Sequence, residues 1–368
     1  MFLARDRAIV IPLGGEALLC SRAPGMMGSD DTDGVDMQTA DPMIRSKRSL
    51  SGIQPTGAPH IGNYFGAIKQ YVDLHYENEG YYFVANYHAL TTVRDPEAMA
   101  RQCYGVALDL LACGLDPGRA TIFLQSDIPE VTELTWILTC VTPMGLLERC
   151  HAYKEKVAQG LPADHGLFAY PVLMAADILA YDSDIVPVGQ DQKQHLEVTR
   201  DIAMRFNNTF GDALTLPEPY ILEHVATVPG LDGRKMSKSY DNTIEIFEPE
   251  GSVRKKIMRI KTDSTPVEDP KDPGNCSLFA LYRLLASPPQ VAEMEERYRR
   301  GGLGYGEVKK ELVDLFFSFF GPMREKRTEI ERDPNYVRDV LHDGACRARM
   351  KAREVLDRVR AACGIPTP

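Results

Sequence analysis

The segment 230–239 reads Gly-Leu-Asp-Gly-Arg-Lys-Met-Ser-Lys-Ser, and it is the most informative stretch of this chain. Its three cations lie in a loop bracketed by glycine, a composition suited to a mobile loop that closes over a polyphosphate. Taken alone, the segment is equally compatible with an exposed basic turn. A second element far upstream, at 59–63, reads Pro-His-Ile-Gly-Asn and also has the character of a phosphate site. Together the two elements predict a site for a phosphorylated ligand.

From Ser49 the chain alternates strand and helix patterns. Apolar residues recur at helical spacing from Ile61, and Asp95-Pro96-Glu97 has the N-cap acid and first-turn proline of a helix start. This alternation predicts an α/β fold, with a parallel sheet covered by helices on both faces. Strands are predicted at 48–53, 81–85, 121–125 and 184–188, and a helix at 191–207. After Ser239 every pattern is helical, at 249–261, 277–286, 289–300, 305–320 and 344–362.

Composition narrows the class of protein. A length of 368 residues suits one large domain or two ordinary ones, and no apolar run is long enough to cross a bilayer. A net charge of −10 argues against general coating of nucleic acid but leaves room for a local basic face. The eight cysteines form no Cys-x-x-Cys pair, so we expect reduced thiols, no structural metal or iron–sulfur cluster, and a cytoplasmic location.

Residues 1–45 differ from the remainder of the chain. They cluster aspartates with glycines and methionines, and their short apolar stretch lacks the length of a signal-peptide core. We expect a poorly ordered N-terminal extension, or sequence upstream of a later start such as Met43.

The two phosphate elements resemble the HIGH and KMSKS signatures of class I aminoacyl-tRNA synthetases. The second signature is complete, whereas the first reads His-Ile-Gly-Asn, a departure from the class pattern that matches the tryptophanyl branch. Three further blocks are similar to that branch in its bacterial form. They are Ser-Gly-Ile-Gln-Pro-Thr-Gly at 51–57, Tyr-Pro-Val-Leu-Met-Ala-Ala-Asp-Ile at 170–178 and Val-Pro-Val-Gly-Gln-Asp-Gln-Lys-Gln-His at 186–195. The resemblance runs from about residue 49 to about residue 363.

The resemblance implies an architecture and a reaction. It implies a Rossmann-like catalytic domain at 46–239, an α-helical anticodon-binding domain at 240–338, and a C-terminal helix at 339–363 that packs back on the catalytic domain. The implied reaction joins L-tryptophan to ATP, giving tryptophanyl-adenylate and pyrophosphate, and then transfers tryptophan to tRNA(Trp). Mg²⁺ would accompany ATP, the enzyme would be a homodimer, and no membrane would take part. Basic runs at 254–261 and 297–300 are then candidates for tRNA contact, or simply solvated helix faces.

For the nucleotide, the resemblance implies catalytic roles for His60, Lys235 and Lys238. A glycine at 189 would allow close packing of the adenosine ribose, and Asp191 would accept from its hydroxyls, although Asp191 is also a plain helix cap. The full set of predicted ATP contacts is Gln54, Pro55, Thr56, His60, Gly62, Asn63, Gly189, Gln190, Asp191, Val228, Lys235, Met236, Ser237, Lys238 and Ser239.

For the amino acid, spacing singles out Asp177. Met174, Asp177 and Ile178 share one helical face, and a carboxylate on an apolar face needs a partner. An indole N–H is donor-only and would supply one, but a lysine or a backbone N–H could do so instead. The predicted tryptophan contacts are Tyr170, Met174, Asp177, Ile178, Val186, Val188, Gln192 and His88, the last of which could equally be a structural histidine.

Three other functional hypotheses compete with that of a tryptophanyl-type synthetase. A tyrosyl-tRNA synthetase shares the fold and the first step, but it needs partners for a phenol that both donates and accepts. A nucleotidyltransferase would share the His-x-Gly element but usually lacks the lysine-rich loop and the helical half. An auxiliary, non-catalytic paralog would bind tryptophan or tRNA only. Two positions, Leu50 and Asn86, depart from the family pattern, where we expect an aromatic residue and an acid.

Overall fold

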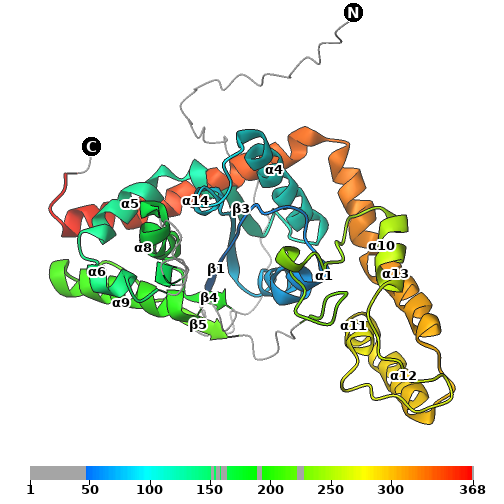
Figure 1. Ribbon diagram of the computed structural model, residues 1–368. Coiled ribbons are helices and arrows are strands. Elements are labelled where there is room, and N and C mark those ends of the chain that lie inside the picture. The colour runs from blue at the N-terminus through cyan, green and yellow to red at the C-terminus, as the bar shows by residue number, and fades with distance from the viewer. Residues whose placement is uncertain are drawn as a thin grey trace, which may run out of the picture. The chain divides into compact units, whose positions relative to one another are not determined.

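The computed structural model describes residues 47–150, 153–154, 158, 164–188, 193–221 and 228–366. Its centre is a parallel sheet of five strands in the order β3-β2-β1-β4-β5 (Figure 1). The predicted α/β class is therefore confirmed. The strands are β1 (Arg48–Ile53), β2 (Glu79–Val84), β3 (Ala120–Leu124), β4 (Ile185–Val188) and β5 (Glu218–Ile221). The order changes direction between β1 and β4, the place where ligands of open parallel sheets bind.

Alternating side chains of the strands enter two separate cores, one on each face of the sheet. In β2, Tyr81 and Phe83 point into one core, whereas Tyr82 and Val84 point into the other. Both faces of a parallel sheet must be covered, which explains why these strands are almost continuously apolar.

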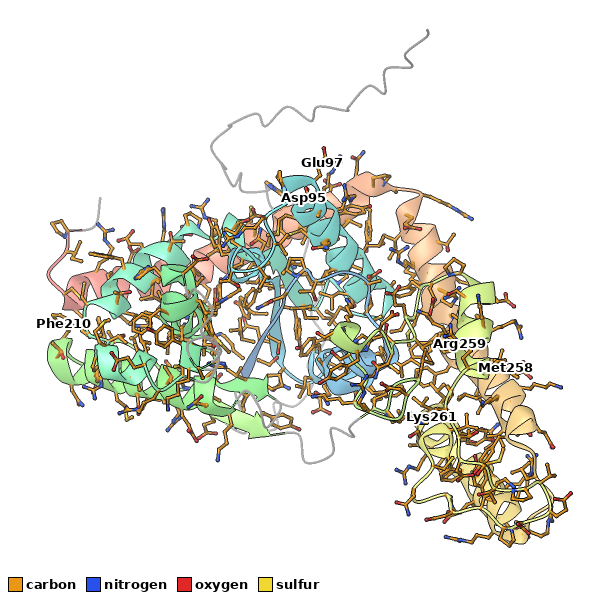
Figure 2. The ribbon with its side chains drawn as sticks, viewed as in Figure 1. Asp95, Glu97, Phe210, Met258, Arg259 and Lys261 are labelled. Atoms are coloured by element: carbon orange, nitrogen blue, oxygen red, sulfur yellow. The ribbon has the colours of Figure 1, made fainter. Side chains whose placement is uncertain are left out.

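The first half of the chain supplies helices to both faces. Asp95 caps α4 as predicted, accepting from the backbone N–H groups of Glu97 (2.9 Å) and Ala98 (3.3 Å), and Figure 2 labels Asp95 and Glu97 at that end of the helix. After α1, the chain continues through a π-helical segment, Tyr64–Ile68, into α2. The helices are α1 (Ile61–Asn63), α2 (Lys69–Leu74), α3 (Asn86–Ala89), α4 (Pro96–Ala112), α5 (Pro129–Thr139), α6 (Met144–Leu147), α8 (His165–Leu179) and α9 (Lys193–Phe210).

The second half is helical, as predicted, but two helices are longer than their patterns indicated. The expected end of α13 at Phe320 is wrong, because the helix continues through Pro322. Its last turns carry Arg324 and Arg327, whose bonds to buried acceptors outweigh the backbone bond that proline removes. The helices are α10 (Glu250–Met258), α11 (Ser277–Leu285), α12 (Pro288–Arg300), α13 (Tyr305–Glu331) and α14 (Pro334–Ala362), the last starting ten residues before the predicted Gly344.

One hydrophobic core spans the predicted boundary near residue 240. Tyr64 and Phe65 pack against Phe319 and Phe320 of α13, with ring centroids 5.2–6.3 Å apart. Residues 45–368 accordingly form one compact unit. The division at 46–239 and 240–338 stays a prediction about roles, and the extension 1–45 lies outside the described residues.

Helix α14 covers β3, one of the two edge strands of the sheet (Figure 1). Gly344 lies so close to the strand that an added β-carbon would be 1.8 Å from the carbonyl oxygen of Ile122. Arg347 donates to the carbonyl of Ala120 at 3.0 Å. The closest approach of helix and strand therefore requires glycine. None of the described helices combines the length and the hydropathy of a membrane span.

Candidate active site

The two predicted phosphate elements lie side by side. The backbone N–H of Ile61 donates to the carbonyl of Ile244 (3.0 Å), just beyond the basic loop. A β-carbon on Gly62 would lie 3.5 Å from the β-carbon of Met236 within that loop. Segments far apart in sequence therefore form one surface next to the carboxyl end of β1.

His60 caps α1 and faces this surface. Its Nδ1 accepts from the backbone N–H of Asn63 (3.2 Å), and the Asn63 side chain accepts from the backbone N–H of His60 (3.1 Å). Burial, together with the positive charge of Lys238, lowers the pKa of His60 to about 4, so the ring is neutral at pH 7. Because Nδ1 is the acceptor, the ring proton resides on Nε2, which can donate to a phosphate oxygen.

The basic loop is held by two buried residues, Met236 and Asn242. The Asn242 side chain accepts from the backbone N–H of Ser237 (2.8 Å) and donates to the carbonyl of Lys235 (3.1 Å). Gly230 makes room for it, since a β-carbon there would lie 2.3 Å from the Asn242 side chain. Sequence analysis missed Asn242, although its position directly after the loop and its capacity to donate and accept were visible.

Both loop lysines are exposed. The Lys238 ammonium donates to the carbonyl of Thr56 (2.9 Å), next to Gly57, whose φ of +95° is one that glycine adopts readily. Partial loss of hydration lowers the pKa of Lys238, and the charges of Glu245 and Asp109 oppose this effect. Lys238 thus joins the loop after β1 to the basic loop.

A buried carboxylate of α4, Asp109, lies near that lysine and is only 4% exposed. It accepts from Nε of Arg327 in α13 (2.7 Å), and this guanidinium lies 5.2 Å from the Phe247 ring centroid. Burial raises the pKa of Asp109 to about 6, against the opposing charges of Arg327 and Lys238. The helical half of the chain therefore supplies the counter-ion for an acid buried in the sheet half.

A cavity of about 440 Å³ lies between β1, β4 and α8. It also borders Gly52, where a β-carbon would lie 2.5 Å from the Phe83 ring, so glycine keeps that wall open. Gln54, predicted for ATP, reaches the same cavity. Six of the side chains predicted for tryptophan line it, namely His88, Tyr170, Met174, Asp177, Ile178 and Val186.

Asp177 is 2% exposed. Its protein partners are neither a lysine nor a backbone N–H, the two alternatives to an indole N–H that the sequence left open. His88 contacts Oδ2 through Nε2 at 2.8 Å, and Gln125 donates to both carboxylate oxygens at 2.9 and 3.0 Å. Burial raises the pKa of Asp177, while the bonds from His88 and Gln125 favour the charged form. Gln125 was missed by sequence analysis, although it stands at the carboxyl end of β3, where ligand-site residues are expected.

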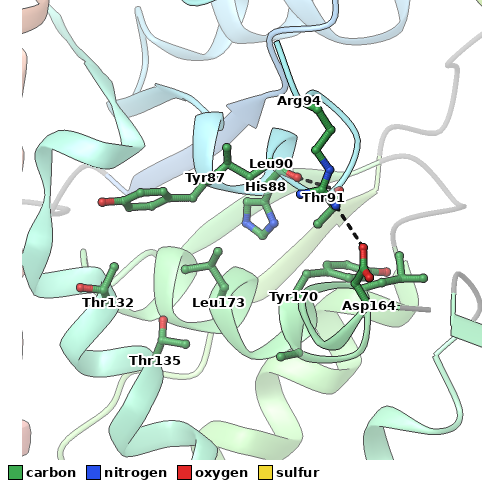
Figure 3. Close-up of a pocket in the computed structure, with 13 residues that line it drawn as sticks. Tyr87, His88, Leu90, Thr91, Arg94, Thr132, Thr135, Asp164, Tyr170 and Leu173 are labelled. Carbon is green, nitrogen blue, oxygen red and sulfur yellow. Dashed lines mark hydrogen bonds and ion pairs between the residues drawn. The ribbon is translucent and has the colours of Figure 1, made fainter. Parts of the chain in front are cut away.

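A second cavity of about 560 Å³ adjoins the first and shares His88, Thr91, Leu167 and Tyr170 with it. Figure 3 shows the His88 ring between Tyr87 and Tyr170, above Leu173 of α8. An ion pair between Arg94 and Asp164 (3.0 Å) crosses one side of this cavity.

Some predicted residues lie elsewhere or outside the described residues. The carbonyl of Val228 accepts from the backbone N–H of Met236 (2.8 Å), and Ser237 accepts from the backbone N–H of Ser239 (3.3 Å), so both help to shape the loop. Pro55 is buried. Gly189, Gln190, Asp191, Gln192 and the side chain of Val188 fall outside the description. Among the described residues, no group of three or more His, Cys, Asp or Glu side chains could hold a metal ion.

Comparisons with known proteins agree with this geometry. A family model described as "tRNA synthetases class I (W and Y)" matches residues 45–321. The chain is 60% identical to a tryptophan–tRNA ligase of Rhodopirellula baltica, over 86% of this chain and 99% of that one. It is 52% identical to a tryptophan–tRNA ligase of Fusobacterium nucleatum, over 87% of this chain and 98% of that one.

A solved structure is similar as well. The tryptophanyl-tRNA synthetase of Campylobacter jejuni, complexed with ADP and tryptophan, has a TM-score of 0.81 at 50% identity, covering 86% of this chain and 99% of that one. The paired phosphate elements, the acid-lined cavity and these full-length similarities lead to one conclusion: the chain belongs to the class I tRNA synthetases of the tryptophan and tyrosine family.

Proposed function

We propose that this chain is a tryptophan–tRNA ligase that activates L-tryptophan with ATP and transfers it to tRNA(Trp). The observation that carries the proposal is the buried Asp177 carboxylate in a largely apolar cavity next to the phosphate elements. An indole is apolar except for one donor, so a buried carboxylate acceptor among apolar side chains matches it. Identities of 46–60% to tryptophan–tRNA ligases, over 86% of this chain, favour tryptophan over tyrosine.

In the first step, a carboxylate oxygen of tryptophan attacks the α-phosphorus of ATP, and the bond from that phosphorus to the bridging oxygen of pyrophosphate breaks. The nucleophile is already an anion, so the step requires positioning and charge stabilisation rather than a general base. Lys235 and Lys238 neutralise the charge that builds on the leaving pyrophosphate. The neutral His60 donates from Nε2 to a phosphate oxygen, oriented by its bond to Asn63.

Several partners complete this proposal. Mg²⁺ would enter with ATP and would supply positive charge where the leaving group forms. In the second step, a ribose hydroxyl at the 3′ end of tRNA attacks the acyl carbon and AMP leaves. The helical half, 240–338, contacts the anticodon stem. The seven cysteines in the described part of the chain are free thiols, which suits a reducing cytoplasm.

We further propose a homodimer whose interface is formed by α5 and by Leu90, the residue that follows α3. Trp136 of α5 is 69% exposed and Leu90 is 51% exposed, and large exposed apolar side chains of this kind mark interaction surfaces. Leu90 lines the second cavity together with Thr135, the neighbour of Trp136. Sedimentation of wild type and of a Trp136→Ser, Leu90→Ser variant tests the dimer, which predicts dissociation in the variant.

The decisive experiment is ATP–pyrophosphate exchange with each of the twenty amino acids. We expect exchange with tryptophan and not with tyrosine or phenylalanine, since a buried polar site left unpaired discriminates by about 10⁴ or more. Exchange with tyrosine instead would establish the rival specificity. An absence of exchange with all amino acids, together with measurable tryptophan binding, would establish the non-catalytic paralog.

A further inference from the structure

Gln125 is the most buried polar side chain at the candidate site that has no part in the chemistry above, with 1% of its surface exposed. It begins a short 3₁₀ turn, Gln125–Asp127, directly after β3. Its amide nitrogen donates to Oδ1 (3.0 Å) and Oδ2 (2.9 Å) of Asp177. Its amide oxygen accepts from the backbone N–H of Tyr87 (3.0 Å), at the start of α3.

The orientation of this amide follows from its neighbours. A carboxylate offers only acceptors, and a backbone N–H offers only a donor. Turning the amide over would place oxygen against the carboxylate and nitrogen against the N–H, losing every bond. Gln125 therefore has a single satisfied orientation, and the amide plane is fixed from both ends.

A count of acceptor positions shows what this fixation does to Asp177. A carboxylate accepts about four hydrogen bonds, two at each oxygen. Oδ2 contacts His88 and Gln125, whereas Oδ1 accepts only from Gln125 among the described residues. The remaining acceptor position is thus on Oδ1, and Asp177 lines the cavity. Fixing the carboxylate plane fixes the direction in which this position points.

We propose that Gln125 is the specificity-positioning residue of the amino-acid cavity: by clamping both oxygens of Asp177, it aims one acceptor at the N–H of an indole. The proposal rests on the proposed function, and it deepens that function by naming the residue through which the cavity reads the N–H. Gln125 does not touch the reacting atoms, and it acts through Asp177.

The chain offers a matched control for a purely structural role. Asn86 ties the same two segments together, donating to the Ser126 hydroxyl (2.8 Å) and accepting from the backbone N–H of Ser126 (3.1 Å). It connects the start of α3 to the turn after β3 without contacting Asp177. If Gln125 only held these segments together, removal of the Asn86 side chain would have the same effect.

The test compares two substrates in ATP–pyrophosphate exchange: L-tryptophan, and β-(3-benzothienyl)-L-alanine, which has the same shape but no N–H. The variant Gln125→Met keeps the side-chain volume and removes the hydrogen bonds. We expect Gln125→Met to lower kcat/KM for tryptophan by roughly 10- to 100-fold, the range for a lost bond to a charged group, mainly through KM. The value for the analogue should change less than about threefold, so the ratio of the two substrates falls.

Asn86→Ala should lower both substrates equally and leave the ratio unchanged. In an Asp177→Asn background, Gln125→Met should have little further effect on the ratio, because the clamped carboxylate is already absent. The proposal is overturned if Gln125→Met leaves the ratio as in wild type, or if Asn86→Ala lowers it as much. Failure of wild type to exchange with tryptophan would instead remove the proposed function itself.

Discussion

The amino-acid cavity and the basic loop are constructed in opposite ways. In the cavity, the polar groups Asp177 and Gln125 are buried and bonded to each other before any ligand arrives. In the loop, the lysines are exposed, and Lys238 donates to a backbone carbonyl. A buried, fixed acceptor discriminates because the wrong ligand leaves it unpaired, whereas an exposed cation can follow charge as it moves from reactant to leaving group. The proposed function therefore assigns selection and acceleration to different parts of the site.

The largest expected effect is at Lys238. Lys238→Ala should slow adenylate formation by about 10²- to 10³-fold, the loss typical of one donor to a developing charge. The dissociation constant of tryptophan should barely change, since the proposed function places the lysine at the pyrophosphate end of ATP. Single-turnover adenylate formation and equilibrium tryptophan binding provide the two measurements. Lys69→Ala, which removes a surface lysine paired with Asp73 (2.6 Å), is the control. Equal losses in rate and binding would contradict the separation of roles.

Asp109 offers a test of the buried framework next to the loop. Its folded-state pKa of about 6 lies above the ordinary value of 3.8, so the folded protein holds the proton more tightly than the unfolded chain. Its stabilising contribution is complete below pH 3.8 and is lost as the pH rises through about 6, in total roughly 3 kcal/mol. The measured quantity is the unfolding free energy of wild type minus that of Asp109→Asn, from urea titrations between pH 3.5 and pH 7. That difference should fall across this window, and a flat difference would contradict the burial argument.

The cavity is tested by Asp177→Ala. We expect a loss of about 1.5–3 kcal/mol in tryptophan binding, the range for a hydrogen bond to a charged group, with ATP binding unchanged. Isothermal titration with each ligand separates the two quantities. The control is Asp164→Ala, which removes an exposed carboxylate just before α8. It should leave both the tryptophan affinity and the ATP affinity unchanged. Tryptophan binding close to that of wild type in Asp177→Ala would show that the indole is read elsewhere.

The smallest expected effect concerns tRNA. Within the described residues, Lys255 and Arg259 have no ion-pair partner, and Figure 2 labels Arg259 with Lys261 at the end of α10. Neutralising either cation should reduce the slope of log affinity for tRNA against log salt by roughly one, as one phosphate contact is lost. Exchange without tRNA should be unaffected.

Arg254 serves as the control for that measurement. It is paired with Glu250 (2.7 Å) and lies 5.2 Å from the Phe317 ring centroid, so its charge is already engaged. Arg254→Gln should change the salt slope less than the other two substitutions. Equal slopes in all variants would place the tRNA on another surface.

Much of the fold was predictable because local patterns determine it. The four predicted strands match β1 to β4 within two residues at each end, and the N-cap at Asp95 is confirmed. Strand β5 was missed because it is short and contains Glu218 and Pro219, residues that are rare in strands away from a sheet edge. The end of α13 was misplaced because Pro322 usually ends a helix, and only distant contacts of the next turn override it.

The candidate site was predictable only in part, for a related reason. Asp177 stood out because an acid on an apolar helical face is rare, and that signal lies within five residues. Its partners Gln125 and His88 are 52 and 89 residues away, so no local pattern joins them. Asn242 was missed for a different reason: its contacts with the loop are local, but an asparagine after a loop has many uses. Long-range polar contacts of this kind require the topology before they can be assigned.

The contact between Gly344 and β3 has a consequence for how the chain is made. Helix α14 follows all the other described elements in the chain, yet it shields the outer edge of β3, a strand from the first half of the sequence. A ribosome that has not reached Pro334 therefore holds a nascent sheet whose open edge can pair with another chain. Truncated products ending before α14 should accumulate as aggregates rather than as inactive monomers. We therefore expect a tag, fusion or nonsense mutation near the C-terminus to lower solubility before it lowers catalytic activity.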